Sequence, residues 1–296
     1  MRRPDGVSVI LSTYNQPRWL EKALWGYAAQ RFTDFEVLVA DDGSGPETAE
    51  VVRRLQARTG LRLVHVWHED RGFRKTEILN RAVLAARGDY LLFSDGDCIP
   101  HPDFVATHAR LARERYFLSG GYLKLPMDVS ERITEADVRS GRAFDADWLR
   151  AHGWRAGRRR IRLPRSAAVA RLLDAVTPTA ASWNGHNAST WRDAIVAVNG
   201  FDLDMGYGGE DRALGERLLN LGYRGRRVRF RAPCLHLDHP RPYADPEIIR
   251  ANRRARAEIR RTRDARTRRG LAEVAREVAT PTDADHSVDA PLSPRR

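Results

Sequence analysis

The sequence predicts an α/β fold in which a mainly parallel sheet is flanked by helices. In the N-terminal third of the chain, short apolar runs alternate with segments of helical periodicity. This alternation implies right-handed crossover connections, which produce parallel strands and cover both faces of the sheet. Polar clusters follow three of the apolar runs, and in such sheets a ligand binds beyond the carboxyl ends of the strands. The sequence therefore places a binding site at one edge of the sheet.

The expected elements follow one another in a regular order. Four apolar runs are predicted strands, and they cover residues 7–11, 35–40, 61–66 and 89–93. Three helices are predicted between them, over 17–30, 48–58 and 75–86. Beyond Pro100 the periodicity weakens over 114–143, and a basic segment with two tryptophans follows over 148–171. A helix is predicted at 214–221, a strand at 228–237, and an Arg/Ala-rich helix from 245 that fades after 280.

Size and cysteine content set further limits. A chain of 296 residues with 42% hydrophobic residues can bury one large core or two modest ones, and we expect one domain with a tail. The two cysteines, Cys98 and Cys234, lie far apart, which argues against a disulfide framework and suits a reducing compartment. The apolar run near the N-terminus ends at residues 13–15, too soon for a signal peptide or a membrane span. We therefore expect a soluble, cytoplasmic protein.

The net charge of +12 predicts attraction to a polyanion such as nucleic acid, anionic lipid or a phosphorylated substrate. Two arginine-rich stretches, 155–165 and 250–269, carry much of the excess. Neither contains a recognisable nucleic-acid reading element, so no specific nucleic acid is expected as a partner. The segment from Trp148 to Arg165 is open to three interpretations: a flexible lid, a solvated loop, or a surface for anionic lipid head groups. The last would place the protein at the inner face of a membrane.

A pair of carboxylates follows the fourth predicted strand. Asp95 and Asp97 are separated only by Gly96, which permits a tight turn, so both could approach one hard divalent cation. Alone, Asp-Gly-Asp is an ordinary surface turn. The first strand, however, ends in the polar cluster 12–15, and the second ends in the cluster 41–44. Convergence of the three clusters at one sheet edge favours a binding site over three unrelated loops.

Taken together, these motifs resemble the family 2 glycosyltransferases of the GT-A fold. The matching stretches are Ser8 to Asn15, Asp41 to Ser44, Asp95 to Asp97, and Asn199 to Asp202 followed by Gly208 to Asp211. The last of these is similar to the C-terminal half of galactosyltransferases, and the resemblance covers roughly residues 6–240. It implies a Rossmann-like GT-A domain over 1–240, with a nucleotide-binding half at about 1–115 and an acceptor half at about 180–240. A basic helical tail over 241–296 would follow, and the oligomeric state is left open.

The resemblance implies transfer of a galactose, N-acetylhexosamine or glucuronate unit from a UDP-sugar to a hydroxyl of a glycan or lipid-linked glycan. Mn²⁺ or Mg²⁺ would neutralise the charge that grows on the leaving diphosphate. By resemblance Asp97 is the direct ligand, and Asp95 holds the ribose or a water on the metal. His239 is the candidate imidazole ligand, with His236 as the competitor, and an imidazole would favour Mn²⁺.

Glycosyl transfer also needs a base for the acceptor hydroxyl, and Glu210-Asp211 provides two carboxylates after a glycine-rich run. By resemblance Asp211 is the base and Glu210 binds acceptor hydroxyls, which implies a single displacement with inversion. The same pair could instead be the acidic first turn of a helix.

The remaining donor-site predictions rest on weaker signals. They are Thr13, Tyr14 and Asn15 for base or ribose, Asp41 or Asp42 for the uracil N–H, Arg74 or Lys75 for the diphosphate, Gly96, Gly208 and Gly209 for close backbone approach, and Asn184, His186 and Asn187 for the sugar pocket. Trp183 either stacks on the sugar or packs in the core. Two other functions are weighed. A nucleotidyltransferase would usually carry a glycine-rich loop after the first strand, and residues 12–18 contain no glycine. A non-catalytic polyanion-binding protein would have no need of all four carboxylates, Asp95, Asp97, Glu210 and Asp211.

Overall fold

The computed structural model describes residues 2–155, 157–164, 166–240 and 244–279. Within these residues, seven strands form one sheet in the order β3-β2-β1-β4-β8-β6-β9, and the first four of these are parallel to one another. The strands are β1 (Val7–Thr13), β2 (Phe35–Asp41), β3 (Leu63–Trp67), β4 (Tyr90–Asp95), β6 (Tyr116–Ser119), β8 (Ala188–Trp191) and β9 (Arg224–Arg227). β8 runs antiparallel to both β4 and β6. The predicted α/β class with a mainly parallel sheet is confirmed.

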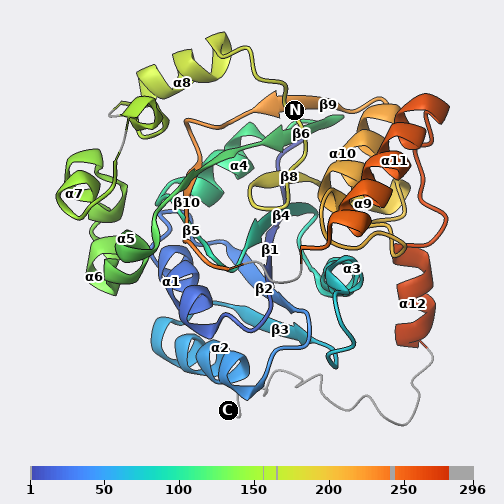
Figure 1. Cartoon of the computed structure of the whole chain (residues 1–296), viewed down its shortest axis with the longest axis horizontal. Coiled ribbons are helices and arrows are strands. Elements are labelled where there is room, and N and C mark those ends of the chain that lie inside the picture. The colour runs from blue at the N-terminus through green and yellow to red at the C-terminus, as the bar shows by residue number, and fades with distance from the viewer. Residues whose placement is uncertain (1, 156, 165, 241–243, 280–296) are drawn as a thin grey trace.

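Helices cover both faces of this sheet (Figure 1). In chain order they are α1 (Pro17–Ala28), α2 (Pro46–Thr59), α3 (Lys75–Ala85), α4 (Phe104–Leu111), α5 (Met127–Arg132), α6 (Glu135–Arg139), η1 (Arg142–Phe144), α7 (Ala146–Ala151), η2 (Gly157–Arg162), α8 (Ala167–Val176), α9 (Arg192–Ala197), α10 (Glu210–Asn220), α11 (Pro246–Thr262) and α12 (Leu271–Ala279). The first three confirm the predicted helices, with Pro at the first turn of α1 and α2, where its missing N–H costs nothing. None of the described helices is long and apolar enough to cross a membrane.

The strand residues alternate between two hydrophobic cores. Val9, Val37 and Leu92 face one core with α1, α2 and α4, whereas Ile10 and Leu38 face the other with α3, α9 and α10. Both faces of the parallel strands are therefore buried, which explains why they are nearly continuous apolar runs in the sequence.

A second, three-stranded sheet lies beside the first and consists of β5 (Cys98–Pro100), β10 (Pro233–His236) and β7 (Gly121–Lys124). It supports a third core, in which residues between 123 and 163, among them the buried Trp154 and Leu163, pack with Trp19, Ile99, Leu235 and Leu237. The weakly periodic stretch after residue 114 thus forms short helices, which pack against this sheet. The pairing of β5 with β10 brings Cys98 opposite His236.

Two sequence predictions need correction. The single strand expected at 228–237 is wrong, because the chain passes from β9 in the large sheet to β10 in the small one through a turn at 228–232. The single helix expected from 245 is also wrong: Arg263 adopts a left-handed backbone and separates α11 from α12. Both helices pack on the domain, α11 against α10 and α12 against α3. The expected fading after 280 lies outside the described residues.

Candidate active site

The carboxyl ends of the parallel strands surround a cavity of about 650 Å³. Strand register sets Ser12 of β1 beside Asp95 of β4, and Thr13 beside Asp41 of β2. Its walls come from these strand ends, the start of α3, β7, the segment before β8, the start of α10 and the end of β10. The predicted residues that line it are Thr13, Tyr14, Asp42, Lys75, Asp95, Gly96, Asp97, Asn184, His186, Gly208, Gly209, Glu210, Asp211, His236 and His239. The structure thus brings together residues from both ends of this set, Thr13 and His239.

At one corner of the cavity two histidines face Asp97. Asp97 Oδ2 lies 2.7 Å from His239 Nε2 and 3.6 Å from His236 Nε2. Each ring lies with Nδ1 2.8 Å from a backbone carbonyl, that of Leu237 for His236 and that of Pro240 for His239. A carbonyl only accepts hydrogen bonds, so Nδ1 carries the proton and Nε2 presents its lone pair to the carboxylate in a neutral ring. Two acceptors at 2.7 Å repel each other unless a proton or a cation lies between them.

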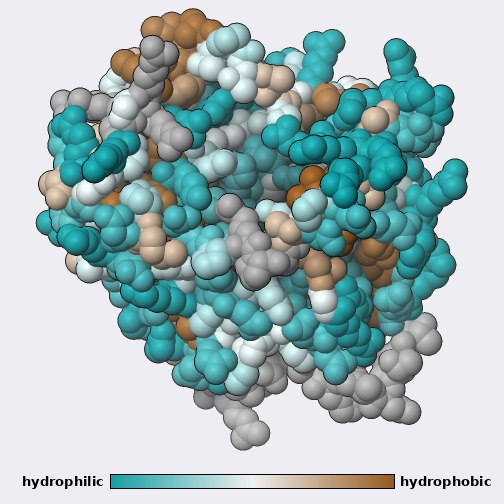
Figure 2. Space-filling view, viewed as in Figure 1, coloured by the Kyte–Doolittle hydropathy of each residue, from teal (hydrophilic) through white to brown (hydrophobic). Residues whose placement is uncertain are grey.

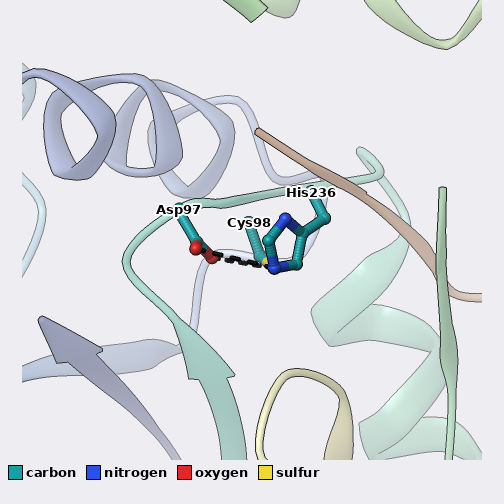
Figure 3. A group of neighbouring side chains, drawn as sticks. All are labelled: Asp97, Cys98 and His236. Atoms are coloured by element: carbon teal, nitrogen blue, oxygen red, sulfur yellow. Dashed lines mark hydrogen bonds and ion pairs between the residues drawn. The ribbon is translucent and has the colours of Figure 1, made fainter. Parts of the chain in front are cut away.

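The donor set at this corner therefore fits a divalent cation. Asp97, Cys98 and His236 also bring their ligand atoms within 4.8 Å of one another, and Figure 3 shows these three side chains pointing together. Cys98 Sγ donates to Asp97 Oδ1 at 3.4 Å, and burial raises the pKa of the thiol well above its usual range. A protonated Cys98 holds the carboxylate in place and is a poor ligand, which leaves one carboxylate and two imidazoles, a set that suits Mn²⁺ or Zn²⁺ better than Mg²⁺.

A second corner gathers three carboxylates around one ammonium. Lys75 Nζ donates to Asp95 Oδ1 at 2.9 Å, and Ser12 Oγ donates to the same oxygen at 2.7 Å. Burial alone would lower the pKa of Lys75, but Asp95 and Glu210 outweigh it and raise that pKa. Burial would likewise raise the pKa of Asp95, yet Lys75 holds it well below its usual range. Lys75 and Asp95 therefore stay charged at neutral pH.

The start of α10 supplies the other two carboxylates. Gly208 and Gly209 have φ values of 103° and 114°, which favour glycine, and their N–H groups both donate to Glu210 Oε2 at 2.9 Å. Burial and the neighbouring Asp211 raise the pKa of Glu210. Asp211 Oδ2 accepts from the N–H of Gly185 at 2.8 Å. This anchoring leaves Asp211 half-buried, with its carboxylate in the wall of the cavity.

Between the two corners the wall is formed by the segment before β8. Asn184 and His186 both line the cavity. Asn184 Oδ1 is buried and has no hydrogen-bond partner within the described part of the chain. Burial lowers the pKa of His186 to about 4, so the imidazole is neutral at pH 7. The ring of Tyr122 lies between His186 and His236, with centroid distances of 4.5 Å and 5.2 Å.

Five predicted site residues do not line the cavity. Trp183 is fully buried and packs edge-on against Phe93 and Phe117, so the expected stacking on a sugar is wrong. Asn187 is fully buried and donates to the carbonyls of Gly121 and Ala232 at 2.9 Å and 2.7 Å.

The other three are held by local contacts. Asp41 pairs with His65 at 2.8 Å and accepts from the Ser44 N–H. The Arg74 guanidinium binds Glu77, and Asn15 accepts from the Gly45 N–H at 3.1 Å. Of the two alternatives left open for each role, the cavity therefore contains Asp42 rather than Asp41 and Lys75 rather than Arg74.

Several lining residues escaped the sequence analysis: Gln16, Phe73, Tyr122, Tyr207 and Arg212. Phe73 and Tyr207 meet edge to face with 5.9 Å between their ring centroids, and they join the loop before α3 to the glycine-rich loop before α10. Their positions in the sequence, close to the predicted site residues Lys75 and Gly208, are the signal that could have identified them. Nothing local marks Tyr122, because only the pairing of β7 with β10 brings it to the site.

Comparison with known proteins identifies related sequences. Residues 8–136 match the family described as glycosyl transferase family 2, and residues 178–240 match the N-terminal domain of galactosyltransferase. The validoxylamine A glucosyltransferase of Streptomyces hygroscopicus subsp. jinggangensis is 34% identical over 228 residues, which are 72% of this chain and 51% of that protein. The chain thus spans about half the length of the curated relatives it matches first.

Solved structures show the same fold. The mannosyltransferase PcManGT of Pyrobaculum calidifontis, in complex with GDP-Man and Mn²⁺, superposes with a TM-score of 0.58 at 23% identity over 90% of this chain and 66% of that one. S. aureus TarS 1–349 in complex with UDP-GlcNAc gives a TM-score of 0.57 at 17% identity, over 91% of this chain and 69% of that one.

Proposed function

The chain belongs to glycosyl transferase family 2, with a C-terminal half of the galactosyltransferase type, and from this premise we propose a metal-dependent, inverting glycosyltransferase. Its donor is a UDP-sugar of the galactose, N-acetylhexosamine or glucuronate type, and its acceptor is a hydroxyl of a glycan or lipid-linked glycan. The observation that carries the proposal is one cavity that contains both the carboxylate of Asp97 facing two histidines and a carboxylate pair at the start of α10.

Asp97, His236 and His239 would hold the cation, which when bound neutralises the charge that grows on the leaving diphosphate. The hydrogen bonds that fix Nδ1 of each histidine keep Nε2 directed toward Asp97, so neither ring would need to turn to bind a cation there. Lys75 already balances the charge of Asp95 and Ser12 donates to the same carboxylate oxygen, so Asp95 suits the ribose better than direct ligation. Lys75 adds a fixed positive charge beside the same site.

Asp211 is the proposed base. As the acceptor oxygen attacks the anomeric carbon, Asp211 takes the hydroxyl proton, the bond from that carbon to the diphosphate oxygen breaks, and the nucleoside diphosphate leaves. The N–H of Gly185 fixes the position of Asp211, and the ammonium of Lys75 lies in the same corner of the cavity. Glu210, with its raised pKa, is suited to bind hydroxyls of the acceptor. With Asp211 as the single base and Glu210 assigned to the acceptor hydroxyls, the proposed reaction is one displacement, which inverts the anomeric carbon.

Donor selection is assigned to the segment before β8 and to the end of β2. The buried, unpartnered Oδ1 of Asn184 is an acceptor for a donor-sugar hydroxyl, since leaving it unpaired is costly. Asp42 lines the cavity near the start of α3 and is the remaining acceptor for a uracil N–H. One solved neighbour carries a guanine nucleotide and another a uracil nucleotide, so both base types belong in the test.

The test measures release of nucleoside diphosphate from UDP-glucose, UDP-galactose, the UDP-N-acetylhexosamines, UDP-glucuronate and GDP-mannose, each with Mn²⁺, Mg²⁺ or EDTA. We expect metal-dependent release from one donor, and NMR of the product should show an inverted anomeric centre. Asp97→Ala should abolish both release and Mn²⁺ binding measured by electron paramagnetic resonance. Asp204→Ala removes an exposed carboxylate and should change neither. Donor turnover that is equal in EDTA would exclude the metal-dependent mechanism, and binding of no nucleotide sugar would exclude the transferase.

A further inference from the structure

Helix α8 exposes a row of large apolar side chains. Val169, Leu172 and Val176 are 47%, 60% and 63% exposed, and their spacing of three and four residues places them on one helix face. Ile161 in the preceding η2 is 53% exposed. Figure 2 shows hydrophobic surface gathered over α8 at the upper edge of the molecule. We call Ile161, Val169, Leu172 and Val176 the α8 surface.

The opposite face of α8 is fixed to the domain. Buried Asp174 accepts from Arg231 Nε at 2.6 Å and from the Phe230 N–H at 3.0 Å. Arg227 donates to the carbonyl of Ala175 in the last turn of the helix at 3.2 Å, and to that of Thr179 beyond the helix at 2.7 Å. The structure thus holds α8 in one orientation with its apolar row outward, and exposure of the row is a property of the packed fold.

The sequence around the α8 surface is strongly basic. The sequence from 155 to 176 contains seven arginines and one acidic residue, Asp174. That carboxylate is already paired with Arg231, so it does not offset the arginines. Arg155 and Arg171 are exposed at either end of this stretch. An apolar row bordered by arginines, without free acidic groups in the sequence around it, is complementary to a surface that is negative at its face and apolar below it.

We propose that the α8 surface docks the protein on an anionic phospholipid bilayer. The apolar row enters the boundary between head groups and acyl chains, and the arginines bind lipid phosphates. A single short helix gives weak, reversible binding that needs both signals together. A protein partner of ordinary composition would leave the arginines without counter-charges, and a second copy of the chain would bring a second set of arginines against the first.

Docking would bring the membrane near the cavity. Arg162 Nη1 donates to the carbonyl of Tyr122 at 2.6 Å, and Tyr122 lines the cavity. After α8 the chain passes through only a short connection to Asn184 and His186, which line it too. A lipid-anchored acceptor could then reach the site from the same surface, and this consequence alone rests on the proposed function. Membrane binding itself does not depend on catalysis.

The test is flotation of the full chain with vesicles of phosphatidylcholine alone, or of equal parts phosphatidylcholine and phosphatidylglycerol. We expect binding to the mixed vesicles that weakens as salt rises, and little binding to the neutral ones. The triple variant Val169→Ser, Leu172→Gln, Val176→Ser should reduce the bound fraction at least about tenfold. A matched triple, Val196→Ser, Leu219→Gln, Val278→Ser, changes side chains of similar exposure elsewhere and should bind as the wild type does.

Each alternative has its own outcome. An equal loss of bound fraction in both triple variants would mean non-specific hydrophobic adsorption and would overturn the proposal. Equal flotation with neutral and with mixed vesicles would overturn it too. An oligomer in the absence of lipid that the α8 triple dissociates would make the surface an interface between copies instead. An unchanged midpoint of urea unfolding in the α8 triple would show that it folds whether or not the chain turns over a nucleotide sugar, so lost membrane binding and a failed transferase assignment stay distinguishable.

Discussion

Two polar clusters lie on either side of the segment from Asn184 to Asn187. The cavity cluster consists of Asp95, Lys75, Glu210 and Asp211, and it is charged and open to solvent. The buried cluster consists of Tyr90, His108, Asn187 and Ser189, and it is closed and neutral. Ser189 Oγ lies 2.8 Å from the Tyr90 hydroxyl and 2.7 Å from His108 Nδ1, and His108 Nε2 lies 3.0 Å from Asn187 Oδ1.

The difference shows how one short segment serves two purposes. In the buried cluster every member has partners, so its hydrogen bonds fix β4 and β8 and contribute to folding stability. In the cavity cluster three carboxylates share one ammonium, so negative charge remains for a substrate or a cation to balance. We therefore expect substitutions in the cavity cluster to reduce activity at little cost in stability, and substitutions in the buried cluster to do the reverse.

The largest expected effect is that of Asp211→Asn. Loss of the base should reduce kcat by about a thousandfold, equivalent to about 4 kcal/mol, while KM for the donor and the midpoint of urea unfolding stay nearly unchanged. The amide oxygen can still accept from the Gly185 N–H, so the loop should keep its position. Steady-state kinetics and urea unfolding measure the two effects, with the exposed Asp204→Asn as control. A variant that keeps more than about a tenth of kcat would move the base to another residue.

Asn187→Ala should have the largest effect on stability, a loss of about 3 kcal/mol in the free energy of unfolding. It removes the amide donor to the buried carbonyls of Gly121 and Ala232 and the partner of His108 Nε2. The matched change Asn184→Ala removes a cavity amide whose hydrogen bonds are 3.4 Å long and should cost less than about 1 kcal/mol. Urea unfolding measures both, and equal losses would erase the distinction between the clusters.

The buried cluster should also carry a pH dependence. Burial lowers the pKa of His108 to about 4, whereas an unfolded histidine titrates near 6.5. Because the unfolded state binds the proton first, stability falls as the pH drops through this window, and His108 should contribute a loss of about 2 kcal/mol between pH 7 and pH 5. His108→Gln should flatten that part of the curve in urea unfolding at several pH values. His186, with a similarly lowered pKa, maintains the remaining slope.

The sequence predicted the parallel half of the fold and most of the cavity because both rest on local signals. Alternating burial makes each strand an apolar run, and its polar end marks the edge of the sheet, so Asp95, Asp97 and Glu210 could be located without coordinates. The corner formed by Asp97, His236 and His239 depends also on a contact between distant segments. Asp97 meets His236 only because β5 pairs with β10, and no local pattern encodes a pairing across more than a hundred residues.

The wrong site predictions concern residues whose type is as common in a buried cluster as in a binding cavity. Trp183 and Asn187 flank the same short segment as Asn184 and His186, yet they point into the cores. The path of this segment into β8 sets the direction of each side chain. The N–H of Gly120 donates to the Asn187 carbonyl and fixes that path. The short helices of the stretch 114–163 could not be predicted from the sequence either, because a third core that includes distant strands holds them in place.

The smallest expected effect concerns two adjacent carboxylates at the end of β2, of which one faces the cavity and the other is buried. Asp42 lines the cavity, with Oδ1 2.8 Å from His68 Nε2, whereas Asp41 is fully buried on His65. Asp42→Asn should raise KM for the donor about fivefold, equivalent to about 1 kcal/mol, because one charged acceptor for the nucleotide base is lost. Asp41→Asn should leave KM unchanged, since its contacts remain inside the protein. Isothermal titration of each variant with the nucleoside diphosphate checks this, and a larger effect at Asp41 would mean that the donor reaches past the wall that Asp42 forms.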